Sequence, residues 1–321
     1  MINKWLKYFF MKKTLVIIAA RGIGDLIYHL PLLRSLYESY REKLIILSNQ
    51  VNHSKEVYKL ENFYKEIIEF ENTRFPFFKT LKVIKNIKNI INKCNVDQLI
   101  LTANSKRLMI PVYLSNVKNK IIFGKGSFFF SKNNKYQNLT HADKIMRYTE
   151  DLNLSNKINN FFLTKPNFKN IDNFQKKHRF INIDSHHDQN NWNIKNYINI
   201  IFQLLSYDIN IYINFSPSKL HFLKLLPKEI INSNKVTLTH NKTISEIIQI
   251  INYCDSVVGN ESGPICLAAS FKKEVHSIYL PIHTKPESQI ISDKTIYYNA
   301  EKESDETITI KIMNTLIKKI L

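Results

Sequence analysis

Short apolar runs alternate with helical patterns along nearly the whole chain, and two of these runs lead into a turn that contains glycine and an acid. The first run is 14–20, and its turn carries Gly24 and Asp25. The second run is 255–259, and its turn is 260–264. Strands that alternate with helices form parallel sheets from right-handed βαβ units. Because ligands bind at the carboxyl ends of such strands, both turns are predicted binding sites.

The pattern predicts an α/β fold with two doubly wound domains. A chain of 321 residues exceeds the size of about 250–300 residues at which single cores stop growing. We expect an N-terminal domain over 12–163, a polar linker over 164–178, a second domain over 179–302 and a closing helix within 303–321. The expected strands are 14–20, 44–48, 66–70, 98–102, 120–123, 180–184, 209–214, 235–239, 255–259 and 274–280. The expected helices are 25–40, 53–60, 77–93, 107–115, 141–152, 194–206, 217–226, 243–253, 263–271 and 304–320.

The chain is strongly basic, with 46 Lys and Arg against 27 Asp and Glu and a net charge of +19. Such a charge favours an anionic partner. A general bias of the composition toward Lys, Asn and Ile explains the larger part of this net charge. An anionic acceptor that binds to a basic surface explains the smaller part. Nucleic-acid binding ranks last, because arginine is scarce and no helix-turn-helix, RNA-recognition or zinc-finger signature is present.

Cysteine usage and hydropathy indicate a cytoplasmic protein, with peripheral attachment to the inner face of the membrane as a further option. The three cysteines show no pairing by spacing, which fits a reducing compartment. No apolar run approaches the ~20 residues of a membrane span.

Four segments stand out by their order and spacing: Gly24-Asp25 followed by Leu30-Pro31-Leu32-Leu33-Arg34, the helix that starts at His141, Trp192 after the strand 180–184, and the signature within 257–281. In these segments the chain resembles glycosyltransferase family 9, the ADP-heptose:lipopolysaccharide heptosyltransferases. The resemblance spans most of 14–285. It implies a GT-B fold, in which two Rossmann-like domains face a central cleft and the C-terminal helix usually returns to the first domain. The helix within 303–321 is placed to do so.

The resemblance implies that Asp25 is the general base of an inverting sugar transfer from a nucleotide sugar, with an ADP-sugar favoured. The acceptor would be a lipopolysaccharide or lipooligosaccharide core or another surface glycan. An N-cap role for Asp25 is the structural alternative. The expected acceptor contacts are Arg21, Gly24 and Lys125. Lys125 belongs to a basic, aromatic loop over 124–138, which either faces an anionic lipid or packs on its own domain.

The expected donor contacts come from the second half: Ser185, His186, Trp192, Lys195, Asn260, Glu261, Ser262 and Gly263. Free N–H groups at a helix start bind a diphosphate, and a carboxylate suits a ribose diol. Ordinary helix capping explains Ser262 and Gly263 equally well. No cofactor and no metal are expected, since the cluster 184–188 lacks a distant Cys or His partner.

The donor half departs from the family pattern at four positions. Asn190 replaces a lysine, Glu261 an aspartate and Cys266 a histidine, and Lys219 follows Pro217 where an acid is common. Lys195, His186, His187 or Lys219 are the candidates for the lost positive charge. Two alternatives therefore stay open: a GT-B sugar-nucleotide-binding protein with a decayed donor site, and a sugar-nucleotide epimerase. The Leu30-Pro31 segment argues against the epimerase.

Overall fold

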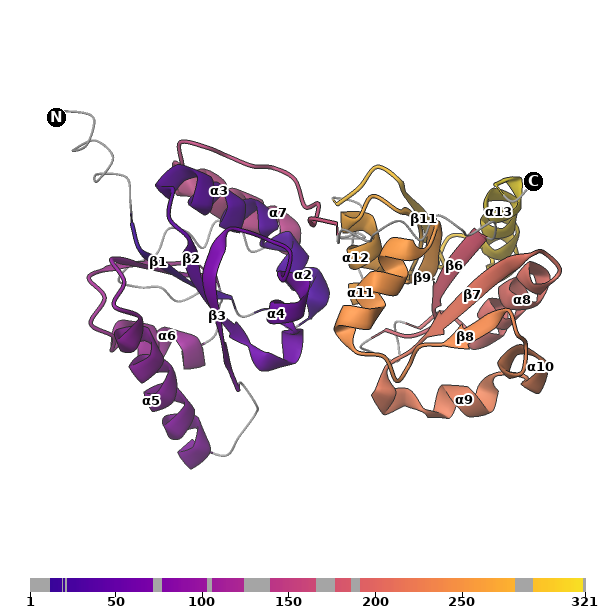
Figure 1. The fold of residues 1–321 in the computed structure, drawn as a ribbon, viewed down its shortest axis with the longest axis horizontal. Helices are drawn as coiled ribbons and strands as arrows, with labels where there is room; N and C mark the ends of the chain where they lie inside the picture. Colours follow the sequence, from indigo (N-terminus) through magenta and orange to yellow (C-terminus); the bar gives the residue numbers. More distant parts are fainter. Residues whose placement is uncertain are drawn as a thin grey trace. The chain divides into compact units, whose positions relative to one another are not determined.

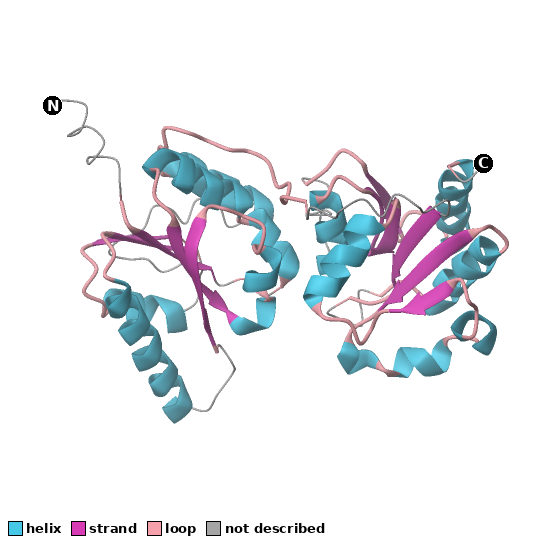
Figure 2. Cartoon of the chain, in the orientation of Figure 1, coloured by secondary structure: helices cyan, strands magenta, loops and turns pink. Residues whose placement is uncertain are grey.

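The computed structural model describes residues 12–18, 20, 22–71, 77–102, 106–123, 139–165, 177–185, 191–280 and 291–319. The chain divides into two compact units, Met1–Phe161 and Phe162–Leu321. Each unit contains one layer of strands with helices packed against it (Figures 1 and 2). In the described part of the chain, no helix is long and apolar enough to cross a membrane.

The first unit is built on a five-stranded sheet in the order β3-β2-β1-β4-β5, and all of its strand pairs are parallel. The strands are β1 (Thr14–Ile18), β2 (Leu44–Asn49), β3 (Tyr64–Phe70), β4 (Gln98–Leu101) and β5 (Asn119–Ile122). The helices are α2 (Ile23–Tyr28), α3 (Leu30–Tyr40), α4 (Ser54–Val57), α5 (Phe77–Cys94), α6 (Lys106–Tyr113) and α7 (His141–Asp151). All five residues of the central strand β1 are buried, because helices cover both faces of the sheet.

The predicted helix 25–40 is wrong in one respect, because the chain forms two helices, α2 and α3, that meet at His29. Pro31 is the second residue of α3 and has no N–H to donate to the preceding turn. The His29 ring is buried in the break, with Nδ1 2.6 Å from the backbone oxygen of Asp25 and Nε2 2.8 Å from Oγ1 of Thr102. A carbonyl only accepts hydrogen bonds, so Nδ1 carries the proton.

The second unit has a six-stranded parallel sheet in the order β11-β10-β9-β6-β7-β8. The strands are β6 (Lys177–Asn182), β7 (Ile209–Asn214), β8 (Val236–Leu238), β9 (Ser256–Asn260), β10 (Glu274–Tyr279) and β11 (Thr295–Asn299). The helices are α8 (Ile194–Leu205), α9 (His221–Leu225), α10 (Lys228–Ile231), α11 (Ile244–Tyr253), α12 (Gly263–Ser270) and α13 (Asp305–Lys318).

Three features of this unit correct the sequence analysis. Strand β11 and the short helix α10 were not predicted, and the predicted helix 217–226 is a 3-10 turn, Pro217–Lys219, followed by α9. As an edge strand, β11 pairs only with β10 and is partly exposed, so it lacks the continuous apolar run of an inner strand.

The C-terminal helix completes the core of the second unit. Ile308, Ile312, Met313 and Leu316 of α13 are buried in one apolar cluster with residues of β6, β9 and α8. The apolar face of this helix is thus used within the second unit, and its expected return to the first domain stays a prediction.

Gly259 in β9 allows the two central strands of this sheet to approach closely. A Cβ at this position would lie 2.6 Å from the backbone oxygen of Asn182 in β6. Changing Gly259 to Ala should lower the free energy of unfolding by about 1–3 kcal/mol, as in other overpacked interiors. Gly22→Ala is the matched control, since a Cβ there meets no atom within 4 Å. Urea denaturation followed by circular dichroism gives both values, and equal midpoints would contradict this account of Gly259.

Burial, together with the nearby His141, lowers the pKa of His29 to about 4. The unfolded chain, with a histidine pKa of about 6.5, then binds a proton that the folded chain does not. Stability present above pH 6.5 should therefore be lost as the pH falls toward 4, by about 3 kcal/mol in total. His29→Asn keeps a donor for the Asp25 carbonyl and should weaken this pH dependence.

Scanning calorimetry at pH 7.5 and pH 4.5 measures how much stability each protein loses on acidification. His53→Asn changes an exposed histidine of the same unit and should behave as the wild type. A His29→Asn protein that loses as much stability on acidification as the wild type would exclude His29 as the cause.

Candidate functional site

Asp25 lies at the carboxyl edge of the first sheet, in the first turn of α2, as predicted. Gly22, in an extended conformation, precedes the helix and brings the chain from β1 to this turn. Gly24 lies in the same turn and is half-buried. The Asp25 side chain is 26% exposed, so its carboxylate can be reached from solvent. No side chain caps this helix, and Asp25 therefore is not its N-cap residue.

A histidine from a distant part of the chain faces this carboxylate. His141 is the first residue of α7, and its Nε2 lies 3.9 Å from Oδ1 of Asp25. That distance is too long for a direct hydrogen bond but short enough for a charge interaction. The ring of His141 also lies against the buried ring of His29, with 5.6 Å between the centroids. A half-exposed carboxylate beside an imidazole is suited to accept a proton from an alcohol.

Hydrogen-bonded amides connect the strand ends at the carboxyl edge of the second sheet. Nδ2 of Asn214, the last residue of β7, donates to Oδ1 of Asn182, the last residue of β6, at 2.7 Å. Oγ1 of Thr239, which follows β8, donates to Oδ1 of Asn214 at 2.9 Å. Nδ2 of Asn182 in turn lies 3.1 Å from Oγ of Ser262. The chain of bonds thus ends at the start of α12.

Asn260, the last residue of β9, contributes a buried amide to this edge. Its Oδ1 accepts from the backbone N–H of Trp192 at 2.8 Å. Its Nδ2 is buried and has no hydrogen-bond partner among the described residues. A buried donor without a partner is costly unless a ligand or water accepts from it.

The start of α12 presents backbone donors at the same edge. Ser262 precedes the helix in an extended conformation and makes no side-chain cap, and Pro264 occupies the first turn. The first N–H groups of a helix have no partner within it, so this end suits an anion. Oε2 of Glu261 accepts a hydrogen bond of 2.9 Å from Oγ of Ser277 in β10, which fixes that carboxylate at the sheet edge.

One predicted donor contact, Trp192, and one candidate for the lost positive charge, Lys219, form bonds within the protein. The Trp192 side chain is buried, and its Nε1 donates to Oδ1 of Asp305 in α13 at 2.6 Å. Nζ of Lys219, a candidate for the missing positive charge, lies 2.7 Å from Oδ1 of Asp184 and 2.6 Å from the backbone oxygen of Ser185. Both side chains therefore shape the edge of the site, and a direct contact of Trp192 with the donor stays a prediction.

The remaining predicted residues divide into two groups. Ser185 is buried in the loop that follows β6, where its N–H donates to Oδ1 of Asn191, and Lys195 is exposed in the first turn of α8. Arg21, Lys125, His186 and Asn190 lie outside the described residues, as does the whole loop 124–138. Cys266 is buried inside α12, below the helix start.

The sequence analysis did not predict the roles of His29, His141 or the linked asparagines. No sequence signal pairs His141 with Asp25, because they are far apart in the chain and α7 brings them together only in the fold. The asparagines did leave a signal: β6, β7 and β9 each end in Asn. Among the described residues, no three His, Cys, Asp or Glu side chains converge in a group that could hold a metal ion.

Solved structures that are similar in fold to this chain include the following three. The glycosyl transferase family 9 protein of Veillonella parvula aligns with a TM-score of 0.76 and 12% identity, over 97% of this chain and 90% of that chain. The E. coli heptosyltransferase WaaC, solved with ADP, gives a TM-score of 0.74 and 13% identity, over 96% of this chain and 100% of that one. E. coli ADP-heptose lps heptosyltransferase II aligns with a TM-score of 0.72 and 13% identity, over 96% of this chain and 99% of that chain.

At these identities the likeness shows the fold, which is GT-B. No curated protein matches the chain by sequence. The sequence model of glycosyltransferase family 9 (heptosyltransferase) matches 130–313, more than half of the 321 residues. On this match, the chain belongs to glycosyltransferase family 9.

Proposed function

We propose that the protein is an inverting glycosyltransferase that moves heptose or a related sugar from a nucleotide sugar to a lipopolysaccharide or lipooligosaccharide core. The observation that carries this proposal is the half-exposed carboxylate of Asp25 beside His141 at a sheet edge. Asp25 takes the proton of an acceptor hydroxyl, the resulting oxygen attacks the anomeric carbon, and the bond to the nucleoside diphosphate breaks on the opposite side. His141, whose Nε2 lies 3.9 Å from Oδ1 of Asp25, borders the place where the acceptor hydroxyl would meet this carboxylate.

The second unit holds the donor in this proposal. The diphosphate accepts hydrogen bonds from the first N–H groups of α12, where the helix dipole also favours negative charge. The buried Nδ2 of Asn260 supplies a further donor. Glu261, held by Ser277, is placed to accept from the hydroxyls of a ribose. An ADP-sugar is the favoured donor, and the protein needs no metal for the transfer.

The acceptor is anionic in this proposal, which gives the net charge of +19 a function. Lysines near an anionic surface contribute about 1 kcal/mol each to binding. The protein would then act in the cytoplasm, at the inner face of the membrane that carries the acceptor.

A nucleotide-sugar-binding protein without transferase activity is the second candidate. The observation that favours it is the bonding of Lys219 to Asp184, which leaves this lysine poorly placed to replace the cation missing at position 190. Turnover by the wild type, measured as ADP released from ADP-heptose in the presence of a heptose-deficient lipooligosaccharide, separates the two candidates.

Replacing Asp25 by Asn should lower turnover by about 10²–10⁴-fold, because the amide keeps the size of the side chain but accepts no proton. The affinity for ADP should stay unchanged, since the donor is bound by the second unit. Asp143→Asn is the matched control: Asp143 is also an acid in the first turn of a helix, α7, and the variant should turn over normally. An Asp25→Asn enzyme with wild-type turnover would exclude this mechanism.

Replacing Gly263 by Val should weaken ADP binding by at least tenfold, because a branched side chain at the first position of α12 displaces the diphosphate. Calorimetric titration with ADP, UDP and GDP measures the effect and identifies the base. Gly22→Val is the control, as it alters a glycine at a helix start of the other unit where the added side chain has space. Equal ADP affinity in both variants would show that the nucleotide binds elsewhere.

A further inference from the structure

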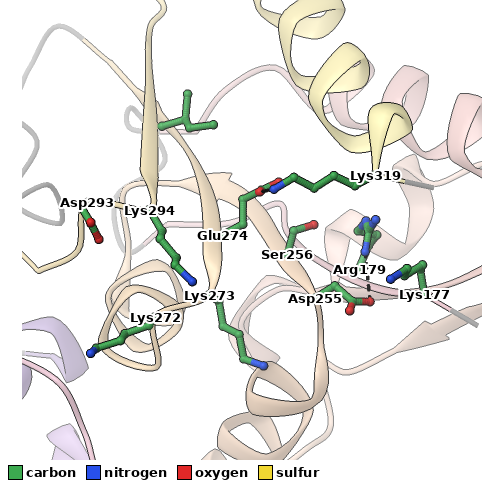
Figure 3. Close-up of a pocket in the computed structure, with 11 residues that line it drawn as sticks. Lys177, Arg179, Asp255, Ser256, Lys272, Lys273, Glu274, Asp293, Lys294 and Lys319 are labelled. Atoms are coloured by element: carbon green, nitrogen blue, oxygen red, sulfur yellow. Dashed lines mark hydrogen bonds and ion pairs between the residues drawn. The ribbon is translucent and has the colours of Figure 1, made fainter. Parts of the chain in front are cut away.

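A cavity of about 510 Å³ lies at the amino ends of the strands of the second sheet. Its walls come from the starts of β6, β9, β10 and β11, from the turn after α12 and from the end of α13 (Figure 3). Because all of these strands are parallel, this edge is opposite to the edge that carries Asn182, Asn260 and Glu261. The cavity is therefore separate from the candidate nucleotide site.

Three side chains form a row across the floor of this cavity. Arg179 in β6 is in register with Ser256 in β9, and Ser256 is in register with Glu274 in β10. Residues in register on parallel strands point to the same face of a sheet, so these side chains are neighbours. All three line the cavity.

Two polar atoms of this row lack partners. The Arg179 side chain is 2% exposed, and its Nη1 donates to the backbone oxygen of His178 and to Oδ2 of Asp255, both at 3.2 Å. Its Nε is buried without a hydrogen-bond partner among the described residues, and so is Oγ of Ser256. An ion pair between Arg179 and Asp255 with a purely structural role accounts for the bonds of Nη1. It does not account for Nε of Arg179 and Oγ of Ser256, which have no partner among the described residues.

Positive charge dominates the wall. Six basic side chains line the cavity: Lys177, Arg179, Lys272, Lys273, Lys294 and Lys319. Of the three acids, Asp255 pairs with Arg179 and Glu274 pairs with Lys319, which leaves Asp293 against the remaining lysines. Burial, together with nearby Lys165 and Lys294, lowers the pKa of Lys273, as expected where cations crowd together. An anion in the cavity would relieve this repulsion.

We propose that this cavity binds a phosphate-bearing ligand, held by the free Nε edge of Arg179, the hydroxyl of Ser256 and the lysines at its mouth. Arginine and hydroxyl donors suit phosphate oxygens, and charge-assisted bonds of this kind are strong. The volume is that of a small-molecule site, which spans about 300–1,000 Å³, and exceeds what one inorganic phosphate fills. The ligand is a soluble phosphorylated compound or the headgroup of a phospholipid, since both present the same group.

The test compares the binding of inorganic pyrophosphate, by calorimetric titration, to four proteins. Lys177→Gln with Lys294→Gln removes two exposed lysines at the cavity, and Lys224→Gln with Lys228→Gln removes two exposed lysines of α9 and α10 as the matched control. The wild type and the control should bind equally, and the cavity variant should bind at least about tenfold more weakly. Equal affinity of the two double variants would overturn the proposal, since binding would then lie elsewhere on the unit.

Ser256→Ala is the fourth protein and separates binding from folding. Its hydroxyl makes no bond within the described protein, so the melting temperature without ligand should not fall. The rise in melting temperature caused by pyrophosphate should shrink, because a ligand stabilises only as far as it binds. A full wild-type rise in Ser256→Ala would contradict the assigned contact.

Vesicles of phosphatidylcholine with and without phosphatidylglycerol distinguish the two sources of phosphate. Binding of the wild type to the anionic vesicles that is lost in the cavity variant but kept in the lysine control supports a lipid headgroup. Pyrophosphate binding without vesicle binding supports a soluble ligand. If neither probe distinguishes the cavity variant from its control, the proposal fails, whatever the outcome of the ADP titrations.

Discussion

Parallel pairing of every strand is the constraint on which the functional sites depend. In both units all strands run in one direction, so every carboxyl end lies on one edge of its sheet and every amino end on the other. Polar residues that are far apart in the sequence, such as Asn182, Asn214 and Asn260, thereby meet without any long loop to position them. The same constraint gathers Arg179, Ser256 and Glu274 at the opposite edge. A sheet of mixed direction would disperse both groups.

The inner strands could be predicted because burial on both faces requires a continuous apolar run, which the sequence displays. The strands β1 and β9 and the turns that follow them were located in this way, and so were Asp25 and the start of α12. Edge elements carry no such signal. Strand β11 is half-exposed and was missed. The break at His29 was also missed, although Pro31, which has no N–H for the preceding turn, is present in the sequence.

A functional residue could be predicted from the sequence only where it lies in the turn directly after a strand. Asp25 and Glu261 follow their strands directly, so the topology alone brings them to the sheet edges. The partner of a charged side chain is harder to predict, because it depends on the packing of helices. Asp184 forms an ion pair with Lys219, and α7 brings His141 close to Asp25. Neither pairing can be predicted from the spacing of these residues along the chain.

Trp192 ties the end of the chain to the edge where the nucleotide is proposed to bind. Its backbone N–H holds the amide of Asn260, while its indole N–H is held by Asp305 at the start of the last helix. Trp192 thus links the end of β9 to the start of α13 by two hydrogen bonds, one from its backbone and one from its indole ring. A frameshift or premature stop codon near position 300 would remove the support on one side of the ring. Because α13 also completes the core of the second unit, such a truncation would destabilise this unit and the proposed binding edge together.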